Sequence, residues 1–357
     1  MPGRPARYYV NLGIRALLEV LDAQGATVWP EVEARIADTR WPSVPYPIDP
    51  HHLTTARQEL VASGRMMETT ALTRGGPGRA GRFVTVQHLP LVWGRRRAVW
   101  LAAQRKRLLY GRFQGWAQPT VRHTRGLVGP AGEAVVHASL RAAALEGRYS
   151  LVRPAGGEVT HLLDGEIPGG PVDDAAVLLA VEQGIPSVPV HLLIEVKNVR
   201  HWIYPSSHEL YQLLRKAAAV QIANPGALVL PVLVCRRRHF TTFAMGLDLG
   251  FYTIEAKQQY VLPRAGIHAL AFQAVRDGLG YLDLALTDGP DGNLTNIFRD
   301  TLPRDALQLA RRWQARATTP KFQVLLHLMG KSGRVSATVL GALRRYAATF
   351  PDALGRW

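Results

Sequence analysis

Two long apolar runs in the middle of the chain limit the folds that it can adopt, because neither is stable when exposed to water. They span residues 190–196 and 227–234, and both are rich in Val and Leu. Runs of this length and composition predict buried strands. Between them, Ser206 and Glu209 have the spacing of a capping box, which predicts a helix over residues 210–222. We therefore expect a core of buried strands that this helix helps to cover.

The length and the cysteine content narrow the class of protein. With 357 residues the chain is long enough for two or three domains, each with its own core. Cys235 is the single cysteine, which excludes a disulfide framework, a multi-cysteine zinc site and a cysteine-held iron–sulfur cluster. A bound metal would have to rest on carboxylates or histidines. No apolar stretch approaches the roughly 18 residues of a membrane span and no apolar signal core follows the first residues, so we expect a soluble, cytoplasmic protein with no membrane partner.

The excess of basic residues is concentrated in one part of the chain. Lys and Arg number 43 against 27 Asp and Glu, a formal net charge of +16. No acidic residue occurs between Glu68 and Glu133. An arginine-rich composition by itself would add Arg without removing Asp and Glu. The pattern therefore predicts a polyanionic partner, and we expect DNA.

The beginning of the chain has the pattern of a small helical domain with a hairpin. Apolar residues at helical spacing predict three helices, one that ends near Gly25, a short one after Pro30 and one that begins after Asp49. Two β-prone runs follow over residues 66–73 and 82–86, joined by a turn rich in glycine and arginine.

This order of elements resembles the winged helix–turn–helix family, and the resemblance implies a DNA-binding domain over residues 1–90. In that family the third helix enters the major groove and the wing lies on phosphates. Many winged helices mediate protein contacts instead, and that alternative stays open. The DNA contacts that the resemblance implies are His51, His52, Thr54, Thr55, Arg57 and Gln58 on the third helix, and Arg74, Arg79 and Arg82 on the wing.

Residues 91–125 form a basic and aromatic segment, which we expect to be a helical linker. Arg95, Arg96 and Arg97 are candidates for phosphate contact. The aromatic residues of the segment can stack on bases or pack the helix onto a neighbouring domain, and the sequence does not separate these alternatives.

From about residue 130 ionisable residues stand next to predicted strands. A helix that starts near Gly132 contains Glu133, and Asp174 directly precedes an apolar run that forms a hairpin with the strand over residues 190–197. Because side chains alternate along a strand, Glu195 and Lys197 at the end of that strand share one face. A glutamate and one of only six lysines are costly to bury there unless they serve a metal, a partner or a substrate.

This arrangement resembles the PD-(D/E)xK nuclease superfamily, over residues 126–270. The resemblance implies a restriction-endonuclease-like core, an α/β (α+β) fold with a mixed sheet flanked by helices, which cleaves phosphodiester bonds with Mg²⁺ or Mn²⁺. It implies that Asp174, Glu195 and the backbone carbonyl of Val196 ligate the metal, that Lys197 orients the attacking water, and that Glu133 completes the acidic cluster. Hard oxygen ligands suit Mg²⁺, which activates bound water and neutralises charge on the phosphate.

Several alternatives to this assignment remain within the sequence. Glu255 and Lys257 form a second Glu-x-Lys pair, but too few residues separate it from Asp248 for a hairpin, so we expect it on a peripheral strand. Asp173 is the alternative to Asp174, which we favour because it abuts the apolar run. In several branches of the superfamily the following helix offers a Gln or a basic residue to the site, and Gln212 is the candidate here.

Residues 271–357 are expected to be mostly helical and basic, and we assign them no chemistry. The sequence therefore predicts a Mg²⁺-dependent DNA endonuclease, in the first place a restriction or defence enzyme with a winged-helix reader. Holliday-junction and transposon-end nucleases share this core and stay as alternatives. A second hypothesis is a non-catalytic DNA-binding regulator on a nuclease-like scaffold. A homodimer is considered as well, because cutting both strands commonly needs two active sites.

Overall fold

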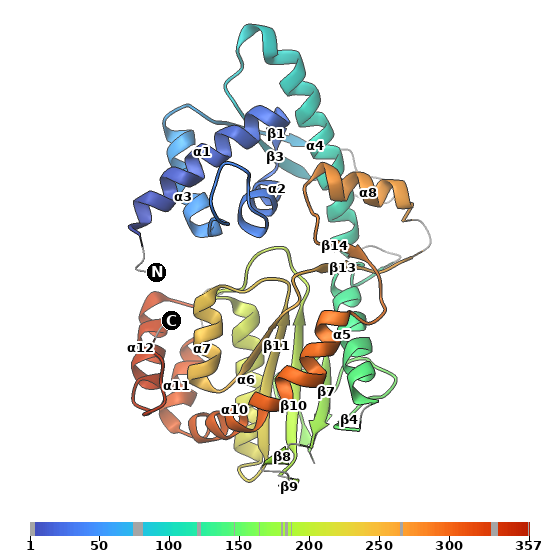
Figure 1. Cartoon of the computed structure of the whole chain (residues 1–357), viewed down its shortest axis with the longest axis vertical. Coiled ribbons are helices and arrows are strands. Elements are labelled where there is room, and N and C mark those ends of the chain that lie inside the picture. Colours follow the sequence, from blue (N-terminus) through green and yellow to red (C-terminus); the bar gives the residue numbers. More distant parts are fainter. Residues whose placement is uncertain are drawn as a thin grey trace. The chain divides into compact units, whose positions relative to one another are not determined.

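The computed structural model describes residues 4–73, 81–119, 123–145, 147–163, 165–179, 181–182, 185–186, 188–264, 267–329, 335–355 and 357 (Figure 1). The chain divides into two compact units, each built from two segments. Unit 1 consists of Met1–Leu127 and Pro263–Leu286, and unit 2 of Val128–Leu262 and Thr287–Trp357. This division differs from the four expected segments, because the expected linker belongs to unit 1 and the C-terminal region is shared between the units.

Unit 1 begins with three helices around a small apolar core. The predicted third helix is present, and its start is fixed by Asp49, whose Oδ1 accepts a hydrogen bond from His51 N at 2.7 Å. The first and third helices approach closely at Gly13, where an added Cβ would lie 3.3 Å from Ala56 Cβ. Leu17 and Leu21 of the first helix and Leu53 and Leu60 of the third are buried in this core. The helices are α1 (Ala6–Gln24), α2 (Trp29–Glu33), which continues as a π-type turn over Ala34–Asp38, and α3 (Pro50–Ala62).

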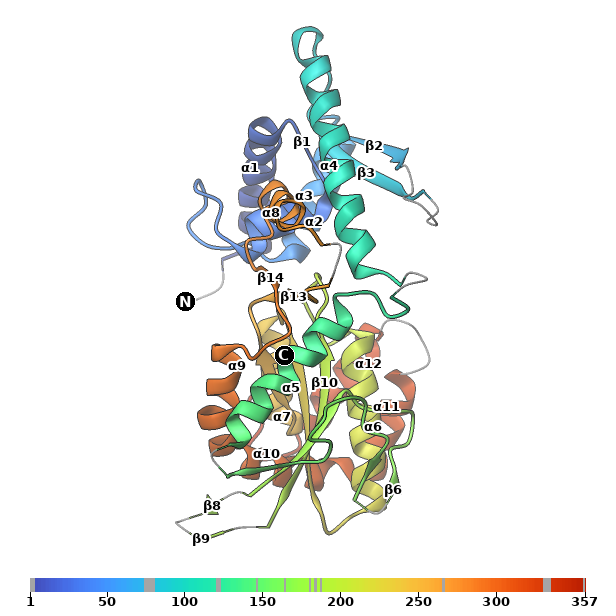
Figure 2. The same cartoon turned by 90° about the vertical axis from the view of Figure 1, so that its right-hand side faces the viewer.

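A three-stranded antiparallel sheet completes this part of unit 1. Its order is β1-β3-β2, with β1 at Ala26–Thr27, β2 at Met67–Leu72 and β3 at Phe83–His88. The hairpin of β2 and β3 confirms the expected pair of strands (Figure 2).

The basic and aromatic segment forms the long helix α4 (Arg96–Ala117), after a 3₁₀ turn at Trp93–Arg95. It packs against α8 (Ala269–Gly278) and the residues that follow α8, which belong to the same unit. The ring of Phe113 lies edge-on to Tyr281 at 5.1 Å, and Trp116 stacks on Phe272 at 5.8 Å. These aromatic residues therefore serve packing within unit 1. Their contacts explain why residues 263–286 belong to this unit. The last element of that segment is β14 (Leu284–Leu286).

Unit 2 is built on a five-stranded mixed sheet, which confirms the expected mixed sheet flanked by helices. The order is β12-β11-β10-β7-β4. The strand β7 pairs antiparallel with both β4 and β10, whereas β10, β11 and β12 run parallel to one another. Their bounds are β4 Tyr149–Leu151, β7 Asp174–Leu178, β10 Val190–Lys197, β11 Leu228–Cys235 and β12 Tyr252–Glu255.

Helices cover both faces of this sheet (Figures 1 and 2). The residues Ala175, Leu193 and Leu233 point toward α6 (His208–Ala223) and share its apolar cluster. By strand alternation, the residues between them point to the opposite face, where α5 (Gly129–Ala144) contacts β10. The remaining short strands of unit 2 are β5 (His161–Leu162), β6 (Gly165–Glu166), β8 (Val181–Glu182), β9 (Ile185–Pro186) and β13 (Gln259–Val261).

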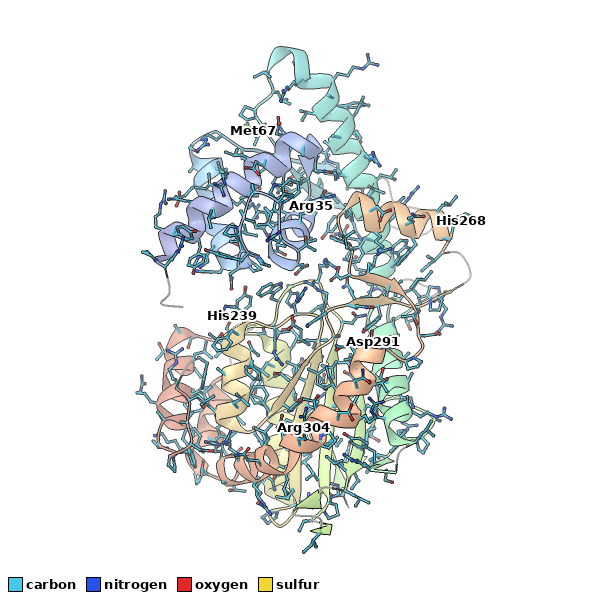
Figure 3. All side chains as sticks on the ribbon, in the orientation of Figure 1. Arg35, Met67, His239, His268, Asp291 and Arg304 are labelled. Atoms are coloured by element: carbon cyan, nitrogen blue, oxygen red, sulfur yellow. The ribbon has the colours of Figure 1, made fainter. Side chains whose placement is uncertain are left out.

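The last part of the chain is mostly helical, as expected, and it packs on the sheet of unit 2. Its helices are α9 (Gly292–Asn296), α10 (Leu302–Ala317), α11 (Pro320–Met329) and α12 (Ala337–Ala347), with a π-type turn at Ile297–Thr301. Asp291, labelled in Figure 3, caps α9, and its backbone N–H donates to Ser139 Oγ of α5 at 2.9 Å. The helix α7 (Phe240–Leu249) ends at Gly250, whose φ of 89° and close approach to Trp313 N of α10 exclude a larger residue.

None of the helices in the described parts of the chain combines the length and the apolar character needed to cross a membrane.

Candidate active site

Asp173 and Glu195 are brought together by the antiparallel pairing of β7 and β10. The register pairs Asp174 with Ile194, so Asp173 stands across from Glu195 at the end of both strands. Asp173 Oδ2 accepts a hydrogen bond from Val196 N at 2.6 Å. Burial, together with the neighbouring charges of Glu195 and Glu133, raises the pKa of the Asp173 carboxyl to about 7. Two carboxylates thus share one end of the sheet.

Each oxygen of Glu195 is bound by a lysine. Lys197 Nζ donates to Oε1 at 2.7 Å, and Lys216 Nζ donates to Oε2 at 3.2 Å. Lys216 comes from α6 and also donates to the carbonyl oxygen of Pro171 at 2.5 Å, just before β7. The Glu195 side chain is only 6% exposed, so these two ammonium groups provide the charge compensation that a buried carboxylate requires.

The basic residue that α6 contributes is therefore Lys216, which the sequence analysis did not select. Gln212 lies one helical turn earlier, and its Nε2 is 3.1 Å from His208 Nε2. The signal was available in the sequence, because Lys216 is another of the six lysines and follows Gln212 at a spacing of four residues.

Asp174 points to the opposite face of the sheet from Glu195 and binds a histidine. Its Oδ2 lies 2.9 Å from His137 Nδ1, and its Oδ1 accepts a hydrogen bond from Ala175 N at 2.8 Å. Burial raises the pKa of the Asp174 carboxyl, although the hydrogen bond with His137 acts in the opposite direction. His137 was missed by the sequence analysis, and its signal is the spacing of four residues from Glu133 on the same helix.

Glu133 is positioned by a close approach of α5 to the end of β10. Asn198, the residue after β10, donates through Nδ2 to the carbonyl oxygens of Val128 at 2.6 Å and Tyr260 at 2.8 Å. The helix comes so near that a Cβ at Gly132 would lie 2.5 Å from Asn198 Cβ. Glu133 consequently lines the same pocket as Asp173, and its charge acts on the Asp173 carboxyl.

The second Glu-x-Lys pair has different surroundings. Glu255 ends β12, which is an edge strand as expected, and it pairs with Arg237 at 3.0 Å. Asp248 is fully buried and accepts hydrogen bonds from Trp357 Nε1 at 2.8 Å and from the backbone of Leu354 and Gly355. That aspartate therefore anchors the last residues of the chain.

The carboxylates of the first site have the donor type that a hard divalent cation prefers. Within the described ranges, however, no three His, Cys, Asp or Glu side chains converge closely enough to hold a metal ion. Asp173 and Glu195 supply two carboxylates, while Glu133 acts on Asp173 through its charge. The residues fit a divalent cation in kind, and the two lysines on Glu195 are the groups that such an ion would have to compete with.

Several of the predicted DNA contacts of unit 1 are engaged by neighbouring side chains, and several are exposed. Arg57 donates to Glu68 Oε1 at 2.7 Å and lies over the Trp29 ring, and His52 stacks on Tyr9. Thr55 Oγ1 donates to the carbonyl oxygen of His51 at 3.3 Å, and Arg95 pairs with Asp22 at 2.8 Å. The exposed candidates are Gln58, Arg82, Arg95, Arg96 and Arg97, together with His51 and with Thr54, whose Oγ1 donates to the carbonyl oxygen of Pro50 at 3.0 Å. Arg74 and Arg79 lie outside the described residues.

Comparison with known proteins finds no matching family model and no significant similarity to a curated protein or a solved structure.

Proposed function

We propose that the protein is a metal-dependent DNA endonuclease with a core of the PD-(D/E)xK type. The observation that carries this proposal is the position of Asp173, Glu195 and Lys197 at one end of β7 and β10. The sheet supports it as well, since three antiparallel strands followed by parallel strands reached through α6 are the order that a restriction-endonuclease-like core requires.

In this proposal Asp173 takes the ligand role for which the sequence favoured Asp174. Asp173 stands beside Glu195, whereas Asp174 is engaged by His137 on the other face. Asp173 and Glu195 would hold Mg²⁺ or Mn²⁺ with the carbonyl of Val196, and Glu133 would add negative charge. The ion would activate water and neutralise charge on the scissile phosphate. Lys197 would place its ammonium beside that phosphate, where it stabilises developing negative charge.

Unit 1 would bind the DNA in the manner of a winged helix. Its order of α1, β1, α2, α3 and the hairpin of β2 and β3, with the sheet order β1-β3-β2, supports this assignment. Exposed Gln58 on α3 and Arg82 on the hairpin would contact DNA, and Arg96 and Arg97 at the start of α4 would contact phosphates. A separate reader in front of the nuclease core favours a restriction or defence enzyme over a junction or transposon-end nuclease.

A second candidate is a DNA-binding regulator that does not cut. It is favoured by the saturation of Glu195, because Lys197 and Lys216 occupy both carboxylate oxygens. In this case the lysines would be structural counter-ions and no cation would enter the site.

The test uses plasmid and branched DNA in Mg²⁺ with matched variants of the two Glu-x-Lys pairs. We expect Glu195→Gln, Lys197→Ala and Asp173→Asn each to reduce cleavage by at least about 100-fold. Glu255→Gln and Lys257→Ala, in the second pair, should cleave like the wild type. Cleavage that survives all three substitutions at the first site would refute the site, and DNA binding by a wild-type protein that never cleaves would support the regulator.

A further inference from the structure

A pocket of about 590 Å³ lies along α5 and extends the candidate active site. It is lined by Glu133 and Asp173 at one end and by Arg141 two helical turns farther along. A molecule bound at the carboxylates can therefore continue directly into this pocket.

Small residues make up a large part of the pocket lining. Ala134, Ala138 and Ala142 follow one another at successive turns of α5, among the larger lining residues Glu133, His137, Arg141 and Leu145 of the same helix. Ala155, Gly156 and Gly157 line the pocket from the loop after β4. The alanine methyl groups and the two glycines offer a smooth surface that suits a flat apolar group.

His137 holds α5 and this loop at a fixed separation. Its Nδ1 contacts buried Asp174, and its Nε2 lies 3.3 Å from the carbonyl oxygen of Pro154 in the facing loop. A Cβ at Gly156 would lie 3.1 Å from His137 Cδ2, so the loop rests on the imidazole ring. The pocket is thus built by specific contacts and is not a gap left by poor packing.

The charges around the pocket disfavour a phosphate inside it. The lining includes the carboxylates of Glu133, Asp173 and Asp288, while the permanent cation among the lining residues is Arg141. A phosphate would be repelled by this set, whereas a neutral group with N–H donors would be attracted. A nucleobase is neutral and flat, and its exocyclic amino groups can donate to a carboxylate such as that of exposed Asp288.

We propose that this pocket takes one unstacked nucleobase of the DNA strand whose phosphate lies at Asp173 and Glu195. The inference rests on the proposed function and deepens it by naming the substrate class. The favoured DNA has an unpaired base at the point of cleavage, because removing a paired base from a duplex costs additional free energy.

The experiment measures DNA binding by fluorescence anisotropy in Ca²⁺, a hard cation that the same carboxylates would hold, under conditions in which the DNA stays uncut, so that its readout is independent of cleavage. Two duplexes of equal length are compared, one fully paired and one with a single bulged adenine. We expect the wild type to bind the bulged duplex about tenfold more tightly. Ala138→Leu, which fills the pocket, should remove this preference and leave the affinity for the paired duplex within about twofold. Ala144→Leu, on the same helix outside the pocket, should keep the preference.

Equal binding of both duplexes by the wild type, or a preference that Ala138→Leu retains, overturns the pocket assignment while DNA binding itself stands. A wild type that binds neither duplex contradicts the proposed function instead. Free deoxyadenosine is the third arm: saturable binding at about millimolar concentration that is lost in Ala138→Leu, combined with equal binding of the paired and the bulged duplex, would assign the pocket to a free nucleoside and overturn the DNA-strand proposal.

Discussion

Lys216 Nζ lies 3.2 Å from Glu195 Oε2 and 2.5 Å from the carbonyl oxygen of Pro171. One ammonium group from α6 thereby joins the end of β10 to the residue that leads into β7. These are the two strands that carry the carboxylates of the candidate site. The contact makes Lys216 a positioning residue for Asp173 and Glu195, in addition to a counter-ion.

Replacing Lys216 by Met should lower the free energy of unfolding by about 1–3 kcal/mol, because a buried carboxylate oxygen and a carbonyl lose their donor. Chemical denaturation followed by circular dichroism measures this change. The control is Lys257→Met, whose exposed side chain leaves stability within about 0.5 kcal/mol of the wild type. An unchanged Lys216→Met protein would show that the ammonium contributes nothing to holding the two strands.

The approach of α5 to β10 predicts opposite effects for two glycines of one helix. Gly132→Ala should destabilise the protein by about 1–3 kcal/mol, since the new Cβ would lie 2.5 Å from Asn198 Cβ. Gly129→Ala meets no atom within 4 Å and should be neutral or stabilising by about 0.4–1 kcal/mol. Thermal melting of both variants checks the pair, and similar melting temperatures would contradict the close approach.

Arg57 is predicted to stabilise unit 1 through its ion pair with Glu68. The loss of unfolding free energy in Arg57→Ala should therefore depend on pH. The hydrogen bond from Arg57 lowers the pKa of the Glu68 carboxyl, so the stabilisation is complete above the ordinary pKa of glutamate. It is lost as the pH falls through the lowered pKa and the carboxylate becomes protonated. We expect Arg57→Ala to cost about 0.5–1 kcal/mol at pH 7 and less at pH 3, measured by urea denaturation. An equal loss of unfolding free energy at pH 7 and pH 3 would exclude the ion pair as the source of the stabilisation.

Lys106 is expected to be structural despite its place in the basic segment. Its side chain is 6% exposed, and its Nζ donates to Glu31 Oε1 at 2.5 Å and to the carbonyl oxygen of Gly278 at 2.7 Å. Glu31 also pairs with Arg35, labelled in Figure 3, at 2.9 Å. Lys106→Ala should therefore destabilise the protein by about 3–5 kcal/mol. The control is Arg105→Ala, which changes the exposed residue directly before Lys106 and should change stability by less than about 0.5 kcal/mol.

Thermal melting measures the stability of the Lys106→Ala and Arg105→Ala proteins, and DNA affinity is measured on the same samples. A Lys106→Ala protein that melts like the wild type but binds DNA more weakly would reverse the assignment and make Lys106 a DNA contact.

Local patterns predicted most of the helices and strands of this chain. The helix expected over residues 210–222 is α6 at His208–Ala223, and the apolar run at 227–234 is β11 at Leu228–Cys235. The capping box expected at Ser206 and Glu209 does not start α6. Ser207 directly precedes the helix, and Glu209 pairs with His201 instead. Periodicity identifies an element well because it depends on neighbours within the segment, whereas the contacts at its ends involve other segments.

The sequence by itself determined the chemical inventory of the protein: a basic region without carboxylates, one cysteine, and a Glu-x-Lys pair at the end of a buried strand. Tertiary structure decided which partners this pair has. The register of β7 on β10 turned Asp173 toward Glu195 and Asp174 toward His137, and the packing of α6 brought in Lys216. Those contacts join residues 21 to 37 positions apart, and their proximity follows from the packing of the sheet and helices and not from any local pattern.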